Sequence, residues 1–448
     1  MASLHEQGRL RIDRVDGPQL WPFMDSNKND ISCSSSRTKL AQQYRAALLE
    51  DVIPFWLQNG MDKEFGGIIT AIDRDGKVLD TDKSVWFQGR AAWMFATLYG
   101  HVERRSEWLE AAKSCIEFSQ KHCFATNGKM YFTVTRDGRP LRMRRYVYSE
   151  SFAAIASAAF ARIQGDPQAK AHAEHCFETY LHYSFFPGLI APKLHEQTRR
   201  TVGIGPYMIA IATAQELRAN LGDVVVLEKT CTEWIDYCLD VIERLFVKPD
   251  LEALMELVGP RGELLDHFDG RTLNPGHAIE CAWFIMHEGR YRNDRRLVEL
   301  GTTILDWMWR RGWDNEYGGL FYFRDVRDLP VQEYWHDMKF WWPHNEAIIA
   351  TLLAWKLTGQ SRYAQWHRLV HDWSFGHFAD REFGEWYGYL HRDGTCSVRL
   401  KGNMWKGPFH LPRMLWYCWS LLSSDDSNDL QDRDIRENAR SPHCHPVP

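Results

Sequence analysis

The sequence lacks the features that mark exported or membrane-spanning proteins. It contains no run of about 18 apolar residues, so no segment is expected to cross a bilayer. Residues 1–17 have no apolar stretch of the kind that a secretory signal needs, and no Asn-x-Ser/Thr glycosylation site occurs. The ten cysteines are scattered without a Cys-x-x-Cys pair, and most lie in apolar helical patterns. We therefore expect a cytoplasmic protein with reduced thiols.

An excess of charge of one sign is also missing. The 54 basic and 59 acidic residues are interspersed and give a formal net charge of −5, which argues against nucleic acid or a membrane surface as a partner. The chain has no phosphate-binding loop, no serine-hydrolase elbow, no His-Glu-x-x-His pair and no dinucleotide-binding glycine motif. We expect neither a metal ion nor a nicotinamide cofactor.

Aromatic residues are abundant instead. The sequence has 20 Trp, 17 Tyr and 23 Phe, or 13% of all residues. Ordinary cores are built mainly from Leu, Ile and Val, so the excess of Trp indicates either bulky packing or flat walls for a ligand such as a sugar ring. Composition alone favours packing for the set as a whole.

Apolar residues recur at helical spacing in segment after segment, whereas strand-like alternation is confined to short pieces such as residues 129–138 and 318–325. The pattern predicts twelve helices, over residues 40–57, 86–100, 106–123, 149–163, 167–183, 207–220, 227–247, 277–288, 294–311, 344–358, 361–378 and 409–423.

The connectors between these helices alternate strictly between short (about two to six residues) and long (about 23 to 32). Such alternation predicts an all-α fold, an (α/α)6 barrel of six helical hairpins, with short β-hairpins in the long loops at one rim. The even-numbered helices are expected to line its interior. Residues 38–423 would form this single domain, and the polar segments 1–37 and 424–448 are expected to be disordered.

A short motif repeats in three of the long connectors. It begins at Asp62, Asp314 and Asp380 and reads Asp-x-Glu-Phe/Tyr-Gly-Gly/Glu. The first and third copies continue to an Asp-Gly pair thirteen residues after the opening aspartate, which is a hairpin signal. We interpret the repeated aspartates as turn-fixing residues in preference to catalytic ones.

Polar residues gather where the even-numbered helices begin. The candidates are Arg90, Glu150, His277, Glu280, Trp341, Trp342, His344, Glu346, His410 and Arg413. Ionisable groups at the inner ends of buried helices need partners or a wet cavity, so we expect one convergent site.

Two histidines at helix N-termini, His277 and His410, are expected to act as neutral bases or weak acids near pH 7 and to exchange protons with opposite faces of a substrate. Arg90 would stabilise an oxyanion. Together they suit proton abstraction next to a carbonyl, as in an epimerase. The alternative from the same residues is an inverting glycosidase that uses two of the carboxylates Glu280, Glu346 and Asp380.

Several long motifs resemble the N-acylglucosamine 2-epimerase family, also called renin-binding proteins, in its animal branch. They are WFQGR at 86–90, TRDGRP at 135–140, YSESF at 148–152, NPGHAIECAWF at 274–284, GWDNEYGGLFYF at 312–323, MKFWWPHNEA at 338–347 and FGEWYGYLHRDG at 383–394. The similarity runs in order from about residue 40 to 422.

The resemblance implies a homodimeric (α/α)6 barrel that interconverts N-acetyl-D-glucosamine and N-acetyl-D-mannosamine, feeding sialic acid metabolism. It implies ring opening followed by C2 proton exchange through an enediolate, without metal or nicotinamide and with ATP or another nucleotide as an activator. The family's histidine pair maps onto His277 and His410, its essential arginine onto Arg90 and its essential glutamate onto Glu346. Residues expected to contact the sugar are Glu280, Trp342, Trp341, His344, Glu150, Trp86 and Trp386.

One departure narrows the substrate. Cellobiose 2-epimerases carry an additional histidine motif near the sixth helix, where this chain reads Gly205-Pro-Tyr-Met-Ile209, which argues against a disaccharide substrate. Two alternatives stay open: an isomerase of mannose and fructose with the same histidines, and a protein that mainly binds a renin-like protease. The sequence does not decide which histidine acts on which face of C2.

Overall fold

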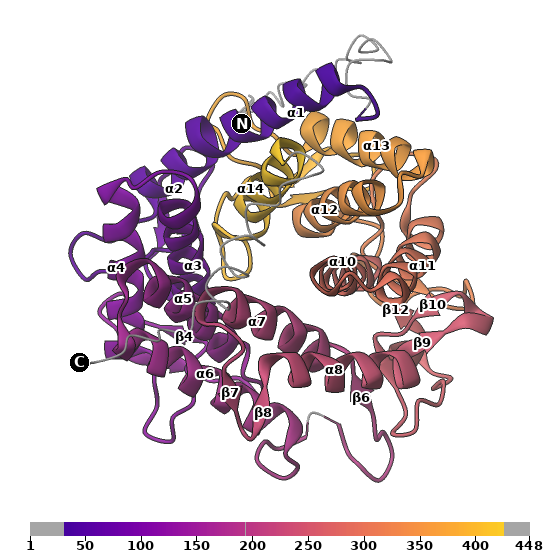
Figure 1. Cartoon of the computed structure of the whole chain (residues 1–448), viewed down its shortest axis with the longest axis horizontal. Helices are drawn as coiled ribbons and strands as arrows, with labels where there is room; N and C mark the ends of the chain where they lie inside the picture. Colours follow the sequence, from indigo (N-terminus) through magenta and orange to yellow (C-terminus); the bar gives the residue numbers. More distant parts are fainter. Residues whose placement is uncertain (1–30, 193, 425–448) are drawn as a thin grey trace, which may run out of the picture.

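The computed structural model describes residues 31–192 and 194–424. Its helices form a closed double ring (Figure 1). The inner helices are α3 (Val85–His101), α5 (Tyr148–Gln164), α7 (Gly205–Leu221), α10 (Pro275–Arg292), α12 (Trp341–Thr358) and α14 (His410–Ser423). The outer layer comprises α1 (Ser34–Ala46), π-helical η1 (Ala47–Val52), α2 (Ile53–Asn59), α4 (Ser106–His122), α6 (Pro167–Phe185), α8 (Cys231–Val241), π-helical η2 (Ile242–Phe246), α11 (Arg295–Gly312) and α13 (Ser361–His377).

Each inner helix packs against the outer helix that follows it, and α14 packs against α1 to close the ring. The burial pattern explains this layering: α10 is buried around most of its circumference, whereas α11 buries one apolar stripe that includes Leu297, Ile304 and Met308. The (α/α)6 barrel predicted from the connectors is confirmed. Helix α1 begins at Ser34, inside the segment 1–37 expected to be disordered; residues 1–30 and 425–448 lie outside the described residues.

Short antiparallel strands join the long loops around one rim. The pairs and triplets are β1 (Ala71–Ile72) with β2 (Val78–Asp80); β3 (Lys83–Ser84), β4 (Thr133–Val134) and β5 (Pro140–Arg142); β6 (Val202–Gly203) with β11 (Leu257–Val258); β9 (Val247–Lys248) with β10 (Ala253–Leu254); β12 (Thr272–Leu273) with β13 (Arg324–Asp325); and β14 (Lys339–Phe340), β15 (Tyr389–Leu390) and β16 (Cys396–Val398). The loops also contain the 3₁₀ turn η3 (Pro249–Leu251) and the single-turn helix α9 (Phe268–Arg271).

One hairpin departs from the prediction that the strands gather at one rim. Strands β7 (Val225–Val226) and β8 (Lys229–Thr230) lie in the connector between α7 and α8, which leads from an inner to an outer helix. Their turn has positive φ angles at Leu227 and Glu228, the backbone of a two-residue hairpin without the usual Asn-Gly signal. No local sequence pattern therefore predicts this hairpin.

The three repeated aspartates fix turns, as predicted. Each accepts hydrogen bonds on Oδ1 from backbone N–H groups that follow it in the turn. Each also pairs with a buried lysine and with an arginine from another long loop. The sets are Asp62 with Lys83 and Arg136, Asp314 with Lys339 and Arg392, and Asp380 with Lys401 and Arg74. These ion pairs tie the loops together, including the last loop to the first, and so hold the rim on which the site is built.

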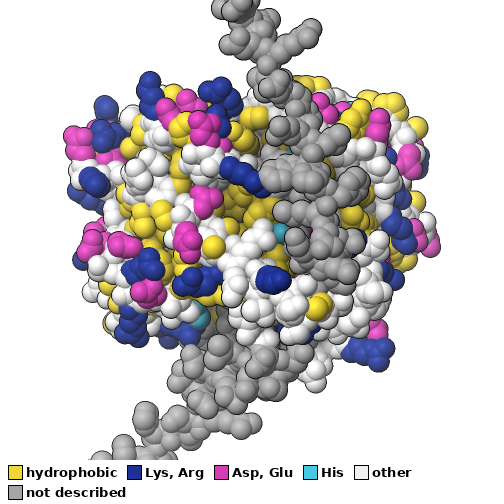
Figure 2. All heavy atoms as spheres, turned by 90° about the horizontal axis from the view of Figure 1, so that it is seen from above, with side chains coloured by type: hydrophobic (Ala, Val, Ile, Leu, Met, Phe, Trp, Pro, Cys, Tyr) yellow, Lys and Arg dark blue, Asp and Glu magenta, His cyan; other side chains and the backbone are white. Residues whose placement is uncertain are grey.

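The outer surface matches the balanced charge of the sequence. Figure 2 shows acidic and basic side chains interspersed with small hydrophobic areas on the visible face. Within the part of the chain that the structure describes, no helix is both long enough and apolar enough to cross a bilayer.

Candidate active site

A cavity of about 820 Å³ lies inside the ring of inner helices. On α10 its lining residues run from His277 through Glu280 and Trp283 to His287 and Tyr291, a rise of roughly 21 Å along the helix axis. The cavity therefore follows the barrel axis from the rim of long loops to the opposite end. The predicted residues that line it are Arg90, His277, Glu280, Trp86, Trp341, Trp342 and His410.

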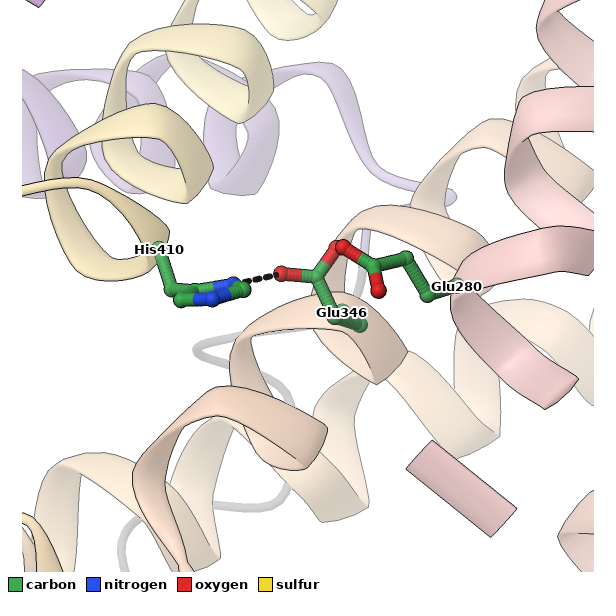
Figure 3. Close-up of side chains that lie close together, drawn as sticks. All are labelled: Glu280, Glu346 and His410. Carbon is green, nitrogen blue, oxygen red and sulfur yellow. Dashed lines mark hydrogen bonds and ion pairs between the residues drawn. The ribbon is translucent and has the colours of Figure 1, made fainter. Parts of the chain in front are cut away.

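His410 stands at the start of α14 and is bonded to a buried carboxylate. Its Nδ1 lies 2.7 Å from Oε1 of Glu346, a residue with no exposed surface (Figure 3). With Nδ1–H donating to this carboxylate, Nε2 carries the lone pair. Burial, reinforced by the positive charges of Arg90 and Arg413, holds the pKa of His410 well below its usual value. His410 is thus neutral and suited to accept a proton.

Glu346 acts through its neighbours, because it does not itself line the cavity. Besides His410, it accepts hydrogen bonds from Nε1 of Trp283 at 2.8 Å and from Nη2 of Arg413 at 2.5 Å. Burial raises the pKa of its carboxyl, and Arg413 opposes that rise. This geometry makes Glu346 a positioning residue for His410 rather than a group that touches substrate.

His277 has a different carboxylate partner. Its Nδ1 lies 3.0 and 3.1 Å from the two oxygens of Glu256, which directly precedes β11. Burial lowers the pKa of His277, but the charge and hydrogen bond of Glu256, followed by the charges of Glu280 and Glu346, raise it above its ordinary value overall. The opposite pKa shifts favour His277 as the weak acid of the pair and His410 as the neutral base.

Both histidines pack against one indole. The ring centroid of Trp342 lies 5.0 Å from that of His277 and 5.9 Å from that of His410. Trp341 stands beside it, 6.1 Å from His410. A small substrate lying over Trp342 would thus be within reach of both imidazoles, one with a lowered and one with a raised pKa.

Arg90 is enclosed by aromatic rings. Its guanidinium carbon lies 4.2 Å from the ring centroid of Phe152, 5.0 Å from that of Phe409 and 5.1 Å from that of Trp86. Burial and the nearby Arg413 lower the pKa of Arg90 to about 9, so it stays charged at neutral pH. Among the described residues its Nε has no hydrogen-bond partner. Arg90 thus offers a desolvated positive charge to an oxyanion in the cavity.

Glu280, Glu346 and His410 place one ligand atom each within 4.8 Å of one another, a spacing that a metal ion could use (Figure 3). However, Nη2 of Arg413 donates to Glu280 at 2.9 Å as well as to Glu346. Since the guanidinium already compensates both carboxylates, the cluster is better described as an ion-pair network than as a metal site.

The carboxylates do not fit the glycosidase alternative. Glu280 and Glu346 share one side of the site through Arg413 instead of flanking a substrate. Asp380 lies in the rim, where it pairs with Lys401 and Arg74, and it does not line the cavity.

Two predicted sugar contacts at helix starts are wrong because the side chains point away from the cavity. Glu150 is buried and accepts a hydrogen bond from the backbone N–H of Met130 at 2.7 Å. His344, also fully buried, lies between the carbonyl oxygen of Phe340 and the N–H of Leu320. Both are used to hold loops against helices α5 and α12.

The tryptophan assignments also need correction. Trp386, expected to face sugar, is buried against the ring of Phe378 at a centroid distance of 5.7 Å and does not line the cavity. Trp93 is 2% exposed and also lines the cavity. Trp405 lies at the mouth of the cavity, 43% exposed and 5.5 Å from Trp86, and no local pattern had marked it.

A closed ring of six helical hairpins with a histidine pair in its cavity defines the protein as an (α/α)6-barrel isomerase. Residues 66–410 match the family model for N-acylglucosamine 2-epimerase. The chain belongs to the N-acylglucosamine 2-epimerase family.

A relative supports this assignment, and two solved structures share the fold. The chain is 36% identical over 385 residues to N-acylglucosamine 2-epimerase of Bos taurus, covering 84% of this chain and 90% of the relative. Its fold resembles that of cellobiose 2-epimerase from Bacillus thermoamylovorans (TM-score 0.74, 18% identity, 85% and 99% of the two chains). It also resembles that of a D-mannose isomerase (TM-score 0.70, 17% identity, 85% and 97%).

Proposed function

We propose that this protein interconverts N-acetyl-D-glucosamine and N-acetyl-D-mannosamine and so supplies sialic acid metabolism. The observation that carries the proposal is the pair of cavity histidines, His410 with a lowered pKa and His277 with a raised pKa, that pack against the same indole, Trp342. The animal relative named above supports the choice of substrate. Inversion at C2 needs one base and one acid on opposite faces of a planar carbon, which these two side chains supply.

The reaction begins on the open-chain aldehyde. Nε2 of His410 takes the proton from C2, the C–H electron pair forms the C1–C2 double bond, and the carbonyl electrons move to O1. Arg90 stabilises the resulting enolate oxygen on C1 with its charge. His277 then returns its own proton to the other face of C2, and the C1 carbonyl forms again. In the reverse direction the two histidines exchange roles.

The rest of the cavity suits a sugar. Trp86, Trp341, Trp342 and Trp405 present flat rings around the mouth, and Glu280 lines the wall next to Arg413. Aromatic faces pack against the C–H groups of sugars, and the carboxylate accepts hydrogen bonds from hydroxyls. No step in this scheme calls for a metal ion or a nicotinamide.

A substrate panel tests the proposal. Purified protein is incubated with N-acetylglucosamine, N-acetylmannosamine, cellobiose, mannose and fructose, each with and without ATP and with and without EDTA. The proposal requires interconversion of the two N-acetyl sugars that survives EDTA. Conversion of mannose to fructose alone would replace it with the isomerase alternative.

Three further expectations accompany the proposed function. We propose that a nucleotide such as ATP raises the activity as an effector, that the protein is a cytoplasmic homodimer, and that a renin-like protease is a secondary partner. They follow from the family resemblance. The ATP arm of the panel and light scattering of the purified protein test the first two, and a pull-down with renin tests the third.

A further inference from the structure

One wall of the cavity differs chemically from the others. Helix α5 contributes Phe152 and Ile155 to it, and helix α7 contributes Met208, Ile209 and Ala212. We call these five residues the apolar wall. None of their side chains can donate a hydrogen bond, and only the weakly accepting sulfur of Met208 can accept one, whereas His277, Glu280 and Arg413 elsewhere in the lining are polar.

The hydroxyl groups beside the apolar wall are already engaged. Oγ of Ser151 donates to the carbonyl oxygen of Tyr148 at 2.8 Å. Oγ1 of Thr213 donates to the carbonyl oxygen of Ile209 at 2.7 Å. Because both protons are used within their own helices, neither of these two hydroxyls can donate to a sugar hydroxyl.

The apolar wall adjoins the groups assigned to the chemistry. The ring of Phe152 lies 4.2 Å from the guanidinium of Arg90 and 5.4 Å from the ring of Phe409, the residue before His410. A substituent on the carbon that lies between the two histidines therefore reaches the wall within a few bonds.

We propose that the apolar wall receives the N-acyl group of the substrate and that its shape sets which acyl chains are accepted. This inference rests on the proposed function. The substrate carries hydroxyls, a carbonyl carbon and an amide, and its acyl hydrocarbon is the apolar part. Placing hydroxyls against the wall would leave them without partners, whereas placing the acyl group there removes apolar surface from water.

The cavity has room beyond an acetyl group. It continues past Ile155 and Ala212 to Trp93, Thr97 and Glu216 further along the inner helices. Longer acyl chains are therefore accepted, and each added methylene that contacts the wall improves kcat/KM by about fourfold until the space is filled.

Two substitutions that change the space at the apolar wall in opposite directions test this assignment. Ala212→Leu fills the wall and Met208→Ala enlarges it, while Met143→Ala, at an exposed position outside the cavity, is the matched control. The measurement is kcat/KM for N-acetyl-, N-butanoyl- and N-hexanoylglucosamine, expressed as the ratio of each longer substrate to the acetyl one.

We expect Ala212→Leu to lower the butanoyl-to-acetyl ratio at least tenfold, Met208→Ala to raise it about fourfold or more, and the control to leave it unchanged. If Ala212→Leu does not fold, the butanoyl-to-acetyl ratio of the Met208→Ala variant tests the inference on its own. Ratios unchanged by Met208→Ala, with all three sugars epimerised, would overturn the inference alone. Absence of epimerisation of every N-acylglucosamine by the unaltered protein would instead overturn the proposed function.

Discussion

The carboxylate of Glu256 lies 3.0 Å from Nδ1 of His277, and this contact sets the two cavity histidines apart. His410 also has a carboxylate partner, Glu346, but burial and the charges of Arg90 and Arg413 lower the pKa of His410. The site thus holds an acid and a base of the same residue type. Because the pKa values of the two histidines are shifted in opposite directions, the site leads to predictions about pH dependence, substitution and isotope exchange.

The pH dependence of kcat/KM should be a broad bell. His410 must be neutral to accept a proton, and its lowered pKa places the acid limb below the ordinary histidine value of 6.5. His277 must be protonated to donate, and its raised pKa places the alkaline limb above 6.5. Initial rates across pH 4.5–9.5 measure both limbs. A single transition centred at 6.5 would contradict the opposite shifts.

The Glu256→Gln substitution should narrow the pH range of high kcat/KM at its alkaline end. Without the carboxylate, burial is the largest influence on His277 and lowers its pKa, so the protonated form is lost at lower pH. We expect the alkaline limb to move down by about one unit or more and the acid limb to stay in place. The control is Glu196→Gln, at an exposed position. Movement of both limbs together, or of neither, would refute the role of Glu256.

Glu346→Gln should reduce kcat by about 10²- to 10⁴-fold without unfolding the barrel, because the amide no longer fixes His410 in the tautomer with Nδ1–H. Since Glu346 does not line the cavity, KM should change less than kcat. Steady-state kinetics and circular dichroism measure the two effects. A variant with raised KM and unchanged kcat would show that Glu346 binds sugar instead.

The ion pairs between loops should stabilise the rim unequally. Asp314→Asn leaves the fully buried Lys339 without its carboxylate, so we expect a loss of about 3–5 kcal/mol in the free energy of unfolding. Glu316→Gln, which removes the exposed partner of the same Arg392, should cost less than about 1 kcal/mol. Urea denaturation measures both, and equal losses would contradict the assignment of the strong interaction to the buried pair.

The sequence predicted the barrel because its signals are local: helical stripes, connector lengths and the Asp-centred turns. It also found the two histidines and Arg90, which mark the starts of inner helices. The sequence predicted less well which face of each inner helix lines the cavity. On α5, Tyr148 and Phe152 line the cavity, and Glu150 lies two residues, or about 200°, from each, so helical spacing would have corrected this residue. On α12 helical spacing does not decide the side of His344, because Trp341 and Trp342 both line the cavity and His344 lies only about 60° around the helix from Trp341.

Glu256 could not have been found in this way. It lies 21 residues before His277 in a loop with no motif, and pairing of β11 with β6 helps to bring it to the cavity. The sign of the His277 pKa shift depends on this contact between distant segments. The same holds for Trp405 and Trp386, whose loop positions gave no indication of which would face the cavity.

Proton exchange at C2 by two different side chains is the central claim, and solvent deuterium tests it most directly. N-Acetylmannosamine is incubated with the protein in D₂O and stopped at low conversion, and both sugars are examined by NMR. The account predicts N-acetylglucosamine that carries one deuterium at C2, recovered substrate without label, and no turnover by a folded His410→Ala variant. Product that retains the original C2 proton, or full activity of His410→Ala, would contradict it.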